Sequence, residues 1–297
     1  MKKIVFILTI LLTVFNVSGQ TVYSGFIDKY PIELVADISN GGPIKAIYGI
    51  YSYSDQDDPI IIDGVLQKGK AIFYEKDKNY KNRALLSFEN FDTHSASLEG
   101  TWTDLRKNRK LKISLAKSFD INYGDSVEWT DREILQAAAL DNQYFKLIVS
   151  KVKGRFYPRV TGVKIFEKKT DKLLQKIVIE SESLSLDNIS VGDYNFDGIK
   201  EFSVFENFYA GPNTSRIYFL FDTTKNTYFR SDFAGVSLTF DDKQKNIFEL
   251  NQCCGGRQYT TATYKVVNNK MVLIEQHCYI WSEEKKKMIE RKMQDCE

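Results

Sequence analysis

The sequence predicts an all-β protein, built as two antiparallel β domains that a short helix joins. Short runs of β-branched and aromatic residues recur along the chain, and Gly, Asn and Asp separate them, which is typical of antiparallel meanders, sandwiches and small barrels. Hydrophobic residues form 43% of the 297 residues and aromatic residues 13%, which is enough apolar mass for packed cores. This composition excludes a disordered chain.

The first 19 residues predict a secretory signal peptide. Lys2 and Lys3 precede the apolar run Ile4–Phe15, and small residues stand at the −3 and −1 positions of a cut after Gly19. The run is short for a membrane-spanning helix, which needs about 20 apolar residues. We therefore expect an exported protein, periplasmic or secreted; an uncleaved anchor or a buried apolar helix is the alternative.

The charge balance argues against nucleic acid as a partner. The chain has 41 Lys and Arg residues against 39 Asp and Glu residues, a net charge of +2, and the lysines of the signal segment account for that excess. A nucleic-acid-binding protein needs a basic face that neutralises phosphates. The only histidines, His94 and His277, leave little material for histidine-based catalysis or a histidine-rich metal cluster.

Residues 20–118 predict the first antiparallel β domain. Its predicted strands are 32–38, 44–53, 59–66, 70–74, 84–91 and 111–115. The start of this domain, Tyr23–Ile27, resembles an accessory β module of exported proteins from Bacteroidetes-type bacteria. That resemblance implies no activity.

Residues 119–141 predict a linker with one short helix. Thr130 and Glu133 have the capping-box spacing, in which the threonine caps the helix start and the glutamate reaches back to its amide. Residues 134–140 follow with strong helix propensity and an apolar face. We expect this helix to bridge the two β domains.

Residues 142–297 predict the second β domain. Its predicted strands are 144–149, 160–166, 174–179, 189–191, 202–208, 217–221, 236–240, 247–250, 259–267 and 271–281. Asn268 and Asn269 separate the last two strands, and they predict a tight hairpin because asparagine tolerates positive φ. The charge pattern of residues 283–296 fits either a helix or a closing strand.

All four cysteines lie near the end of the chain: Cys253, Cys254, Cys278 and Cys296. In an oxidising compartment they predict two disulfides. A bond between the adjacent Cys253 and Cys254 would be strained, so we expect each of these two to pair with one of the other two. A zinc site is the alternative, although the spacing lacks two separated C-x-x-C knuckles.

One stretch of the second domain carries candidate metal ligands. Oxygen donors recur there at every second position: Asp193, Asn195, Asp197, the carbonyl of Ile199, and Glu201. Gly198 allows a sharp turn, and hard oxygen donors at this spacing favour Ca²⁺. The flanks alternate as strands do, and Val204 stands where an EF-hand has its last glutamate, so we expect a structural calcium loop between strands. The alternative is a turn whose side chains bind only their own backbone.

Residues from about 144 to 280 resemble a family of exported bacterial β-proteins related to the periplasmic inhibitors of invertebrate-type lysozyme. The stretch Asp193–Glu201 carries the resemblance, and a Gly/Asn-rich loop and the strand 217–222 follow it. The resemblance implies a compact β fold with bound calcium. In the inhibitors a loop with a Ser-Gly-x-x-Tyr motif enters the lysozyme cleft. This chain has Ser215 and Tyr218 in that region, with no glycine after the serine.

The Gly/Asn-rich loop is the predicted contact segment, because it follows the calcium loop and its strand. Its candidate contact residues are Gly211, Asn213, Ser215 and Tyr218. Three aromatic residues precede this loop and offer the alternative of a carbohydrate-binding face: Phe205, Phe208 and Tyr209.

These features together predict an exported, non-catalytic protein that binds a protein or glycan of the cell envelope, a lytic enzyme being one candidate partner. The chain has no Gly-x-Ser-x-Gly elbow, Walker loop, His-Glu-x-x-His or Gly-x-Gly-x-x-Gly motif. A carbohydrate-binding module is the second hypothesis. A glycoside hydrolase is the third, since a pair of catalytic carboxylates leaves no sequence signature.

Overall fold

The computed structural model describes residues 20–39, 43–54, 56–183 and 185–296. In that part of the chain every element is a strand apart from three one-turn 3-10 helices at Ser185–Asp187, Cys254–Gly256 and Met293–Asp295. The all-β prediction is confirmed. The predicted signal peptide lies outside the described residues. No helix among the described residues is long and apolar enough to cross a membrane.

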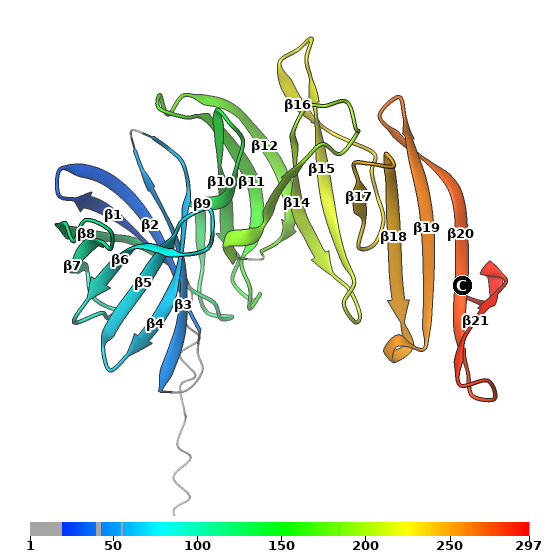
Figure 1. The fold of residues 1–297 in the computed structure, drawn as a ribbon, viewed down its shortest axis with the longest axis horizontal. Coiled ribbons are helices and arrows are strands. Elements are labelled where there is room, and N and C mark those ends of the chain that lie inside the picture. The colour runs from blue at the N-terminus through cyan, green and yellow to red at the C-terminus, as the bar shows by residue number, and fades with distance from the viewer. Residues whose placement is uncertain (1–19, 40–42, 55, 184, 297) are drawn as a thin grey trace, which may run out of the picture.

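A closed antiparallel barrel forms the first part of the structure (Figure 1). Each strand pairs with the next along the chain, and β1 pairs with β8 to complete the ring. The strands are β1 Gln20–Ile27, β2 Tyr30–Ile38, β3 Ile44–Tyr53, β4 Ile60–Gln67, β5 Lys70–Lys76, β6 Asn82–Phe88, β7 Ser97–Asp104 and β8 Lys110–Ile121. The predicted first domain is therefore a barrel.

The barrel's own strands fill its interior. Tyr23 and Phe73 have no exposed surface, and Phe73 meets Phe88 edge to face. Gly64 in β4 allows the neighbouring strand to approach, because a Cβ at this position would lie 1.8 Å from the carbonyl oxygen of Ile72. A side chain there would force β4 and β5 apart.

The prediction of a linker helix is wrong, because Trp129–Ala139 form strand β9. This strand pairs antiparallel with β10 (Gln143–Lys151), and Leu135 lies opposite Lys146. Leu135 and Gln136 are both buried. Helix propensities differ by less than about 1 kcal/mol per residue, so pairing and burial along a whole strand outweigh them.

Three antiparallel sheets follow the barrel and succeed one another from green to red in Figure 1. The second sheet has the order β12-β11-β10-β9, the third β13-β14-β15-β16, and the fourth β17-β18-β19-β20-β21. Their remaining strands are β11 Arg159–Glu167, β12 Leu173–Glu182, β13 Ile189–Gly192, β14 Glu201–Phe208, β15 Thr214–Asp222, β16 Thr227–Arg230, β17 Thr239–Asp241, β18 Asn246–Cys253, β19 Gln258–Val267, β20 Lys270–Ser282 and β21 Lys287–Arg291.

The structure tests two local predictions for the fourth sheet, the hairpin at Asn268 and Asn269 and the conformation of residues 283–296. Asn268 and Asn269 both have positive φ, 51° and 60°, and they connect β19 to β20 as the predicted hairpin requires. Of the two possibilities for residues 283–296, the closing strand is observed as β21.

The buried core crosses the predicted domain boundary near residue 118. Val22 and Ile121 of the barrel belong to the same apolar cluster as Phe145 of the second sheet and Phe202 of the third. A smaller cluster, which includes Tyr218 and Ile247, joins the third sheet to the fourth. The barrel therefore packs directly on the sheets, and the division into two domains stays a prediction.

The predicted cysteine pairing is also wrong. Cys278 in β20 is bonded to Cys296, with Cα atoms 6.0 Å apart, while Cys253 and Cys254 are free and exposed. Strand β21 explains this pairing, because it lies antiparallel to β20 and returns the end of the chain to Cys278.

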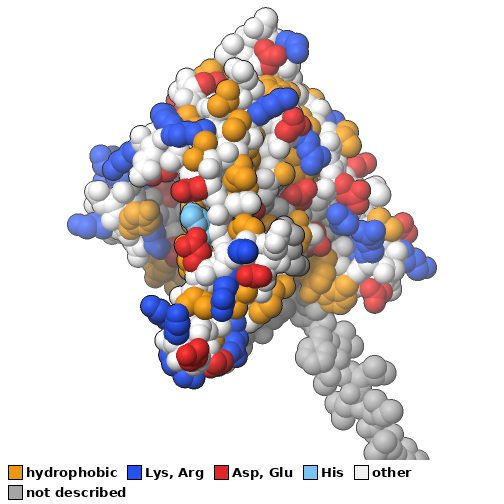
Figure 2. Space-filling view, turned by 90° about the vertical axis from the view of Figure 1, so that its right-hand side faces the viewer, with side chains coloured by type: hydrophobic (Ala, Val, Ile, Leu, Met, Phe, Trp, Pro, Cys, Tyr) orange, Lys and Arg blue, Asp and Glu red, His pale blue; other side chains and the backbone are white. Residues whose placement is uncertain are grey.

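The side of the molecule nearest the fourth sheet carries basic and acidic side chains interspersed with small apolar groups (Figure 2). No single sign of charge dominates this face. The mixed surface agrees with the near-neutral composition of the chain.

Candidate functional site

The predicted calcium loop connects β13 to β14 in the third sheet. Both flanking elements are strands, as predicted, so the loop is not part of a helix–loop–helix unit. Phe196 and Gly198 have positive φ values of 65° and 93°, which make the sharp turn. Glycine adopts such a backbone conformation without steric cost.

The side-chain oxygens of this loop turn inward over its backbone. Asp193 Oδ1 and Asn195 Oδ1 both accept the amide of Asp197, at 3.0 and 3.1 Å, so these two oxygens lie close together. Asp193 Oδ2 accepts the amide of Gly198 at 2.9 Å, and Asp197 Oδ1 accepts the amide of Ile199 at 2.8 Å. These are the bonds of a compact Asx turn.

Glu201 anchors the loop from inside the sheet. The residue is fully buried, and its carboxylate accepts the amides of Tyr194 at 3.0 Å and Phe221 at 3.3 Å. Burial raises the pKa of Glu201 to about 7, the two backbone amides oppose that rise, and the charges of Asp197 and Asp193 add to it. The structure thus places Glu201 behind the loop, where one loop amide and one amide of β15 hold its carboxylate.

The donor set of the loop suits a hard cation. Asp193, Asn195 and Asp197 offer side-chain oxygens and Ile199 offers a carbonyl, and Ca²⁺ takes six to eight oxygen ligands with flexible geometry. Across the described part of the chain, no three His, Cys, Asp or Glu side chains are grouped so that they could hold a metal ion. Coordination would therefore combine the two aspartates with neutral oxygens and water.

The structure buries most of the predicted contact residues. Ser215 and Tyr218 lie inside the third sheet, and Asn213 is only 5% exposed. The Asn213 amide donates to Asn251 Oδ1 at 3.0 Å and to the Gln252 carbonyl at 2.7 Å, and its oxygen accepts the Gln252 amide at 3.0 Å. These side chains position the loop, and Gly211 is the one predicted contact residue that is exposed.

The aromatic residues proposed for a carbohydrate face divide in the same way. Phe205 is buried, whereas Phe208 and Tyr209 are 52% and 48% exposed. The rings of Phe205 and Phe208 have centroids 4.5 Å apart, so the buried ring supports the exposed one.

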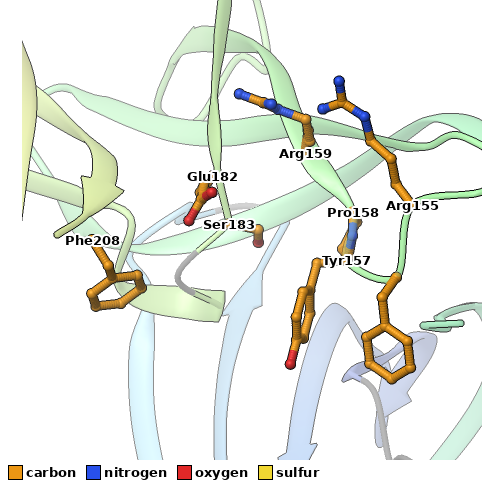
Figure 3. Close-up of a pocket in the computed structure, with 8 residues that line it drawn as sticks. Arg155, Tyr157, Pro158, Arg159, Glu182, Ser183 and Phe208 are labelled. Atoms are coloured by element: carbon orange, nitrogen blue, oxygen red, sulfur yellow. The ribbon is translucent and has the colours of Figure 1, made fainter. Parts of the chain in front are cut away.

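Phe208 lines a pocket of about 540 Å³ at the junction of the second and third sheets (Figure 3). Figure 3 shows Phe208 on one side and Tyr157 on the other, with Glu182 and Ser183 between them. The guanidinium groups of Arg155 and Arg159 extend at the top of that view. Tyr157 is 67% exposed, so its ring is available to a ligand. Sequence analysis singled out only Phe208 of this pocket, because the lining residues come from the ends of β11, β12 and β14 and from the loop after β10.

A buried lysine fixes the loop that carries Tyr157. Lys151, at the end of β10, is 1% exposed, and its ammonium donates to the carbonyls of Val127 at 3.3 Å, Val152 at 2.9 Å and Arg155. The Phe156 carbonyl also accepts a backbone amide, from the segment before β9, at 2.9 Å. Hydrogen bonds from Lys151 and from the backbone therefore fix the loop that carries Tyr157.

The two arginines of the pocket differ in their partners. Arg159 lies 3.5 Å from the carboxylate of Glu180, yet its Nε atom is buried without a hydrogen bond. Arg155 forms no side-chain ion pair among the described residues. Its guanidinium is the free cation of the pocket rim within that part of the chain.

Comparisons with known proteins found only distant similarities in solved structures. No family model matches the chain, and no curated protein matches it. A Xanthomonas type IV secretion system related protein is 16% identical, covers 57% of this chain and 98% of its own, and has a TM-score of 0.35. A Bacteroides fragilis protein provisionally assigned as a 6-phosphogluconolactonase is 9% identical, covers 86% of this chain and 94% of its own, and has a TM-score of 0.34. Sqt1 from Saccharomyces cerevisiae is 8% identical, covers 93% of this chain and 86% of its own, and has a TM-score of 0.30. These distant likenesses carry no argument about function.

Proposed function

We propose that this chain is an exported, non-catalytic binding protein whose loop Asp193–Glu201 holds a structural Ca²⁺ ion. The observation that carries the proposal is the strand-flanked loop itself, in which Asp193 and Asn195 bring their oxygens together on one backbone amide. A bound Ca²⁺ would supply positive charge to a loop in which a half-buried aspartate, Asp193, and an exposed one, Asp197, lie in front of a buried glutamate.

The residues of the loop would then have two roles, ion binding and attachment of the loop to the sheet. Asp193, Asn195, Asp197 and the Ile199 carbonyl would hold the ion, and Glu201 would keep the loop attached to β14 and β15 through its two amide contacts. The Asn195 amide also donates to Asn269 Oδ1 at 3.0 Å in the fourth sheet. The ion would therefore stabilise the junction of the third and fourth sheets.

Calorimetric titration of Ca²⁺ into metal-free protein tests this proposal directly. We expect one binding site in the wild type and none in the Asp193→Ala, Asp197→Ala double variant. Asp241→Ala is the matched control, because Asp241 accepts two backbone amides in a similar turn, at 2.8 and 3.0 Å, and lies outside the loop Asp193–Glu201. Equal Ca²⁺ binding by the wild type and the double variant would overturn the assignment.

A second candidate, binding of a saccharide, is favoured by the pocket between Tyr157 and Phe208. Its volume falls in the range of small-ligand sites, roughly 300–1,000 Å³. Exposed aromatic rings pack on the C–H faces of sugars, while Arg155, Glu182 and Ser183 offer donors and acceptors for hydroxyl groups. A protein partner, such as a lytic enzyme, would meet the exposed Tyr209 and Gly211 instead.

Glycan-array binding separates these two partner classes. We expect the wild type to bind a saccharide, and we expect Tyr157→Ala and Phe208→Ala each to abolish that binding. The control is Phe248→Ala, which removes a ring that is 42% exposed and lies outside the pocket. If no glycan binds, or if the control loses binding equally, the saccharide candidate fails and a lysozyme-inhibition assay tests the protein partner.

A further inference from the structure

Two free cysteines stand side by side in the fourth sheet. Cys253 ends β18 and Cys254 begins the following 3-10 turn, and both are exposed. Interaction with the Cys253 side chain raises the pKa of Cys254 above its ordinary value. The two free thiols thus belong to consecutive exposed residues where β18 meets the turn.

No other cysteine is available to either thiol. The chain has four cysteines, and Cys278 and Cys296 are already bonded to each other. A persistent structural disulfide is typical of an oxidising compartment, where exposed thiols are also oxidised. This step depends on the export proposed above.

The turn that follows has the backbone freedom that a small ring needs. Cys254, Gly255 and Gly256 have φ values of 58°, 66° and 81°. The two glycines adopt such values without a Cβ clash, and a Cβ built on either would meet no atom within 4 Å. Distortion of the Cys253–Cys254 peptide can thus be taken up by the open turn rather than by β18.

We propose that Cys253 and Cys254 form a vicinal disulfide in the exported protein, with a small or protein disulfide as the oxidant. The Cys253 thiolate attacks one sulfur of the oxidant, forming a mixed disulfide and releasing one thiol. The Cys254 thiolate then attacks the Cys253 sulfur, closing the ring and releasing the second thiol. The two cysteines lose two protons and two electrons, and the oxidant gains them as its two thiols.

The competing reaction is exchange with the existing disulfide. Cys253 and Cys296 line one cavity of about 450 Å³, so the Cys253 thiolate could attack Cys296 and release Cys278. Cys278 is fully buried, however, and exchange would leave its thiolate shielded from water. Ring closure leaves no buried charge, so it is the favoured product.

Tryptic digestion under non-reducing conditions distinguishes these products, because cleavage after Lys245 and Arg257 leaves both free cysteines in one peptide, residues 246–257. Full-length protein is collected after export by the cells that produce it, denatured, treated with N-ethylmaleimide and digested. We expect peptide 246–257 without adduct and about 2 Da lighter than the dithiol form. Cys254→Ser should place one adduct on that peptide, and Cys253→Ser should do the same.

The bond between Cys278 and Cys296 reports on the compartment in the same digest. If it is reduced as well, the export proposal fails rather than the ring. If that bond is intact and peptide 246–257 carries two adducts, the vicinal disulfide is refuted. A cross-link from 246–257 to the peptide that contains Cys296 or Cys278, or to a second copy of itself, also refutes it.

Discussion

The barrel and the sheets that follow it are closed in different ways. Each barrel strand has two strand neighbours, because β1 returns to β8, and backbone hydrogen bonds complete the ring. The second, third and fourth sheets each keep two edges. The candidate calcium loop, the pocket and the adjacent cysteines all belong to these open sheets.

Side-chain amides connect neighbouring open sheets. Gln175 of β12 donates to the carbonyl of Tyr228 in β16 and accepts its amide, both at 2.8 Å, which joins the second sheet to the third. Asn195 and Asn213 join the third sheet to the fourth. Main-chain hydrogen bonds close the barrel, whereas the open sheets are joined to one another by buried apolar clusters and a few polar side chains.

The largest expected effect tests whether the barrel is independent of the calcium loop. Phe73→Ala removes a fully buried ring from the barrel core and should cost about 3–5 kcal/mol of unfolding free energy in urea denaturation. The gain in stability from Ca²⁺ should stay unchanged, because the loop lies in the third sheet. Phe26→Ala, at a 50% exposed barrel position, serves as the control. Loss of the calcium effect in Phe73→Ala would show that the two regions are coupled.

Removal of an amide junction should have an intermediate effect. Asn213→Ala deletes three hydrogen bonds and leaves the Gln252 amide without its acceptor, so we expect a loss of about 2 kcal/mol in the same assay. Asn79→Ala changes an exposed asparagine in the barrel and should alter stability by less than about 0.5 kcal/mol. An equal loss of unfolding free energy in both variants would show that the Asn213 hydrogen bonds do not stabilise the junction between the third and fourth sheets.

The smallest effect concerns the exposed edge of the fourth sheet. His277 Nδ1 lies 2.6 Å from Glu290 Oε1 across β20 and β21, and this contact raises the pKa of His277 above its ordinary 6.5. A raised pKa means that the protonated histidine adds stability below pH 6.5 and that this stability is lost as the pH rises through the folded-state pKa. In an NMR titration, Glu290→Gln should lower the pKa of His277. An unchanged titration would exclude the ion pair in solution.

The sequence predicted local features better than long-range ones. The Asn268–Asn269 hairpin and the two strands that flank the loop Asp193–Glu201 follow from residues that are close together in the chain, and both are observed as predicted, while calcium binding by the loop stays a prediction. The prediction of a helix at 130–140 was wrong because local helix propensity does not show that this segment pairs with β10 as a strand. The pocket could not be predicted, since Tyr157 and Phe208 line one pocket only after the second and third sheets pack together and Lys151 fixes the loop that carries Tyr157.

The melting temperature in Ca²⁺ and in chelator tests the central claim most directly. At a free Ca²⁺ concentration near 100 times the dissociation constant, binding adds about 2.7 kcal/mol, and about 2–4 °C of melting temperature follows each kcal/mol in a domain of this size. We therefore predict that Ca²⁺ raises the wild-type melting temperature by about 5–10 °C. The Asp193→Ala, Asp197→Ala variant should melt alike in both conditions. A wild type that melts at the same temperature with Ca²⁺ and with chelator would contradict the account and leave Asp193–Glu201 as a hydrogen-bonded turn.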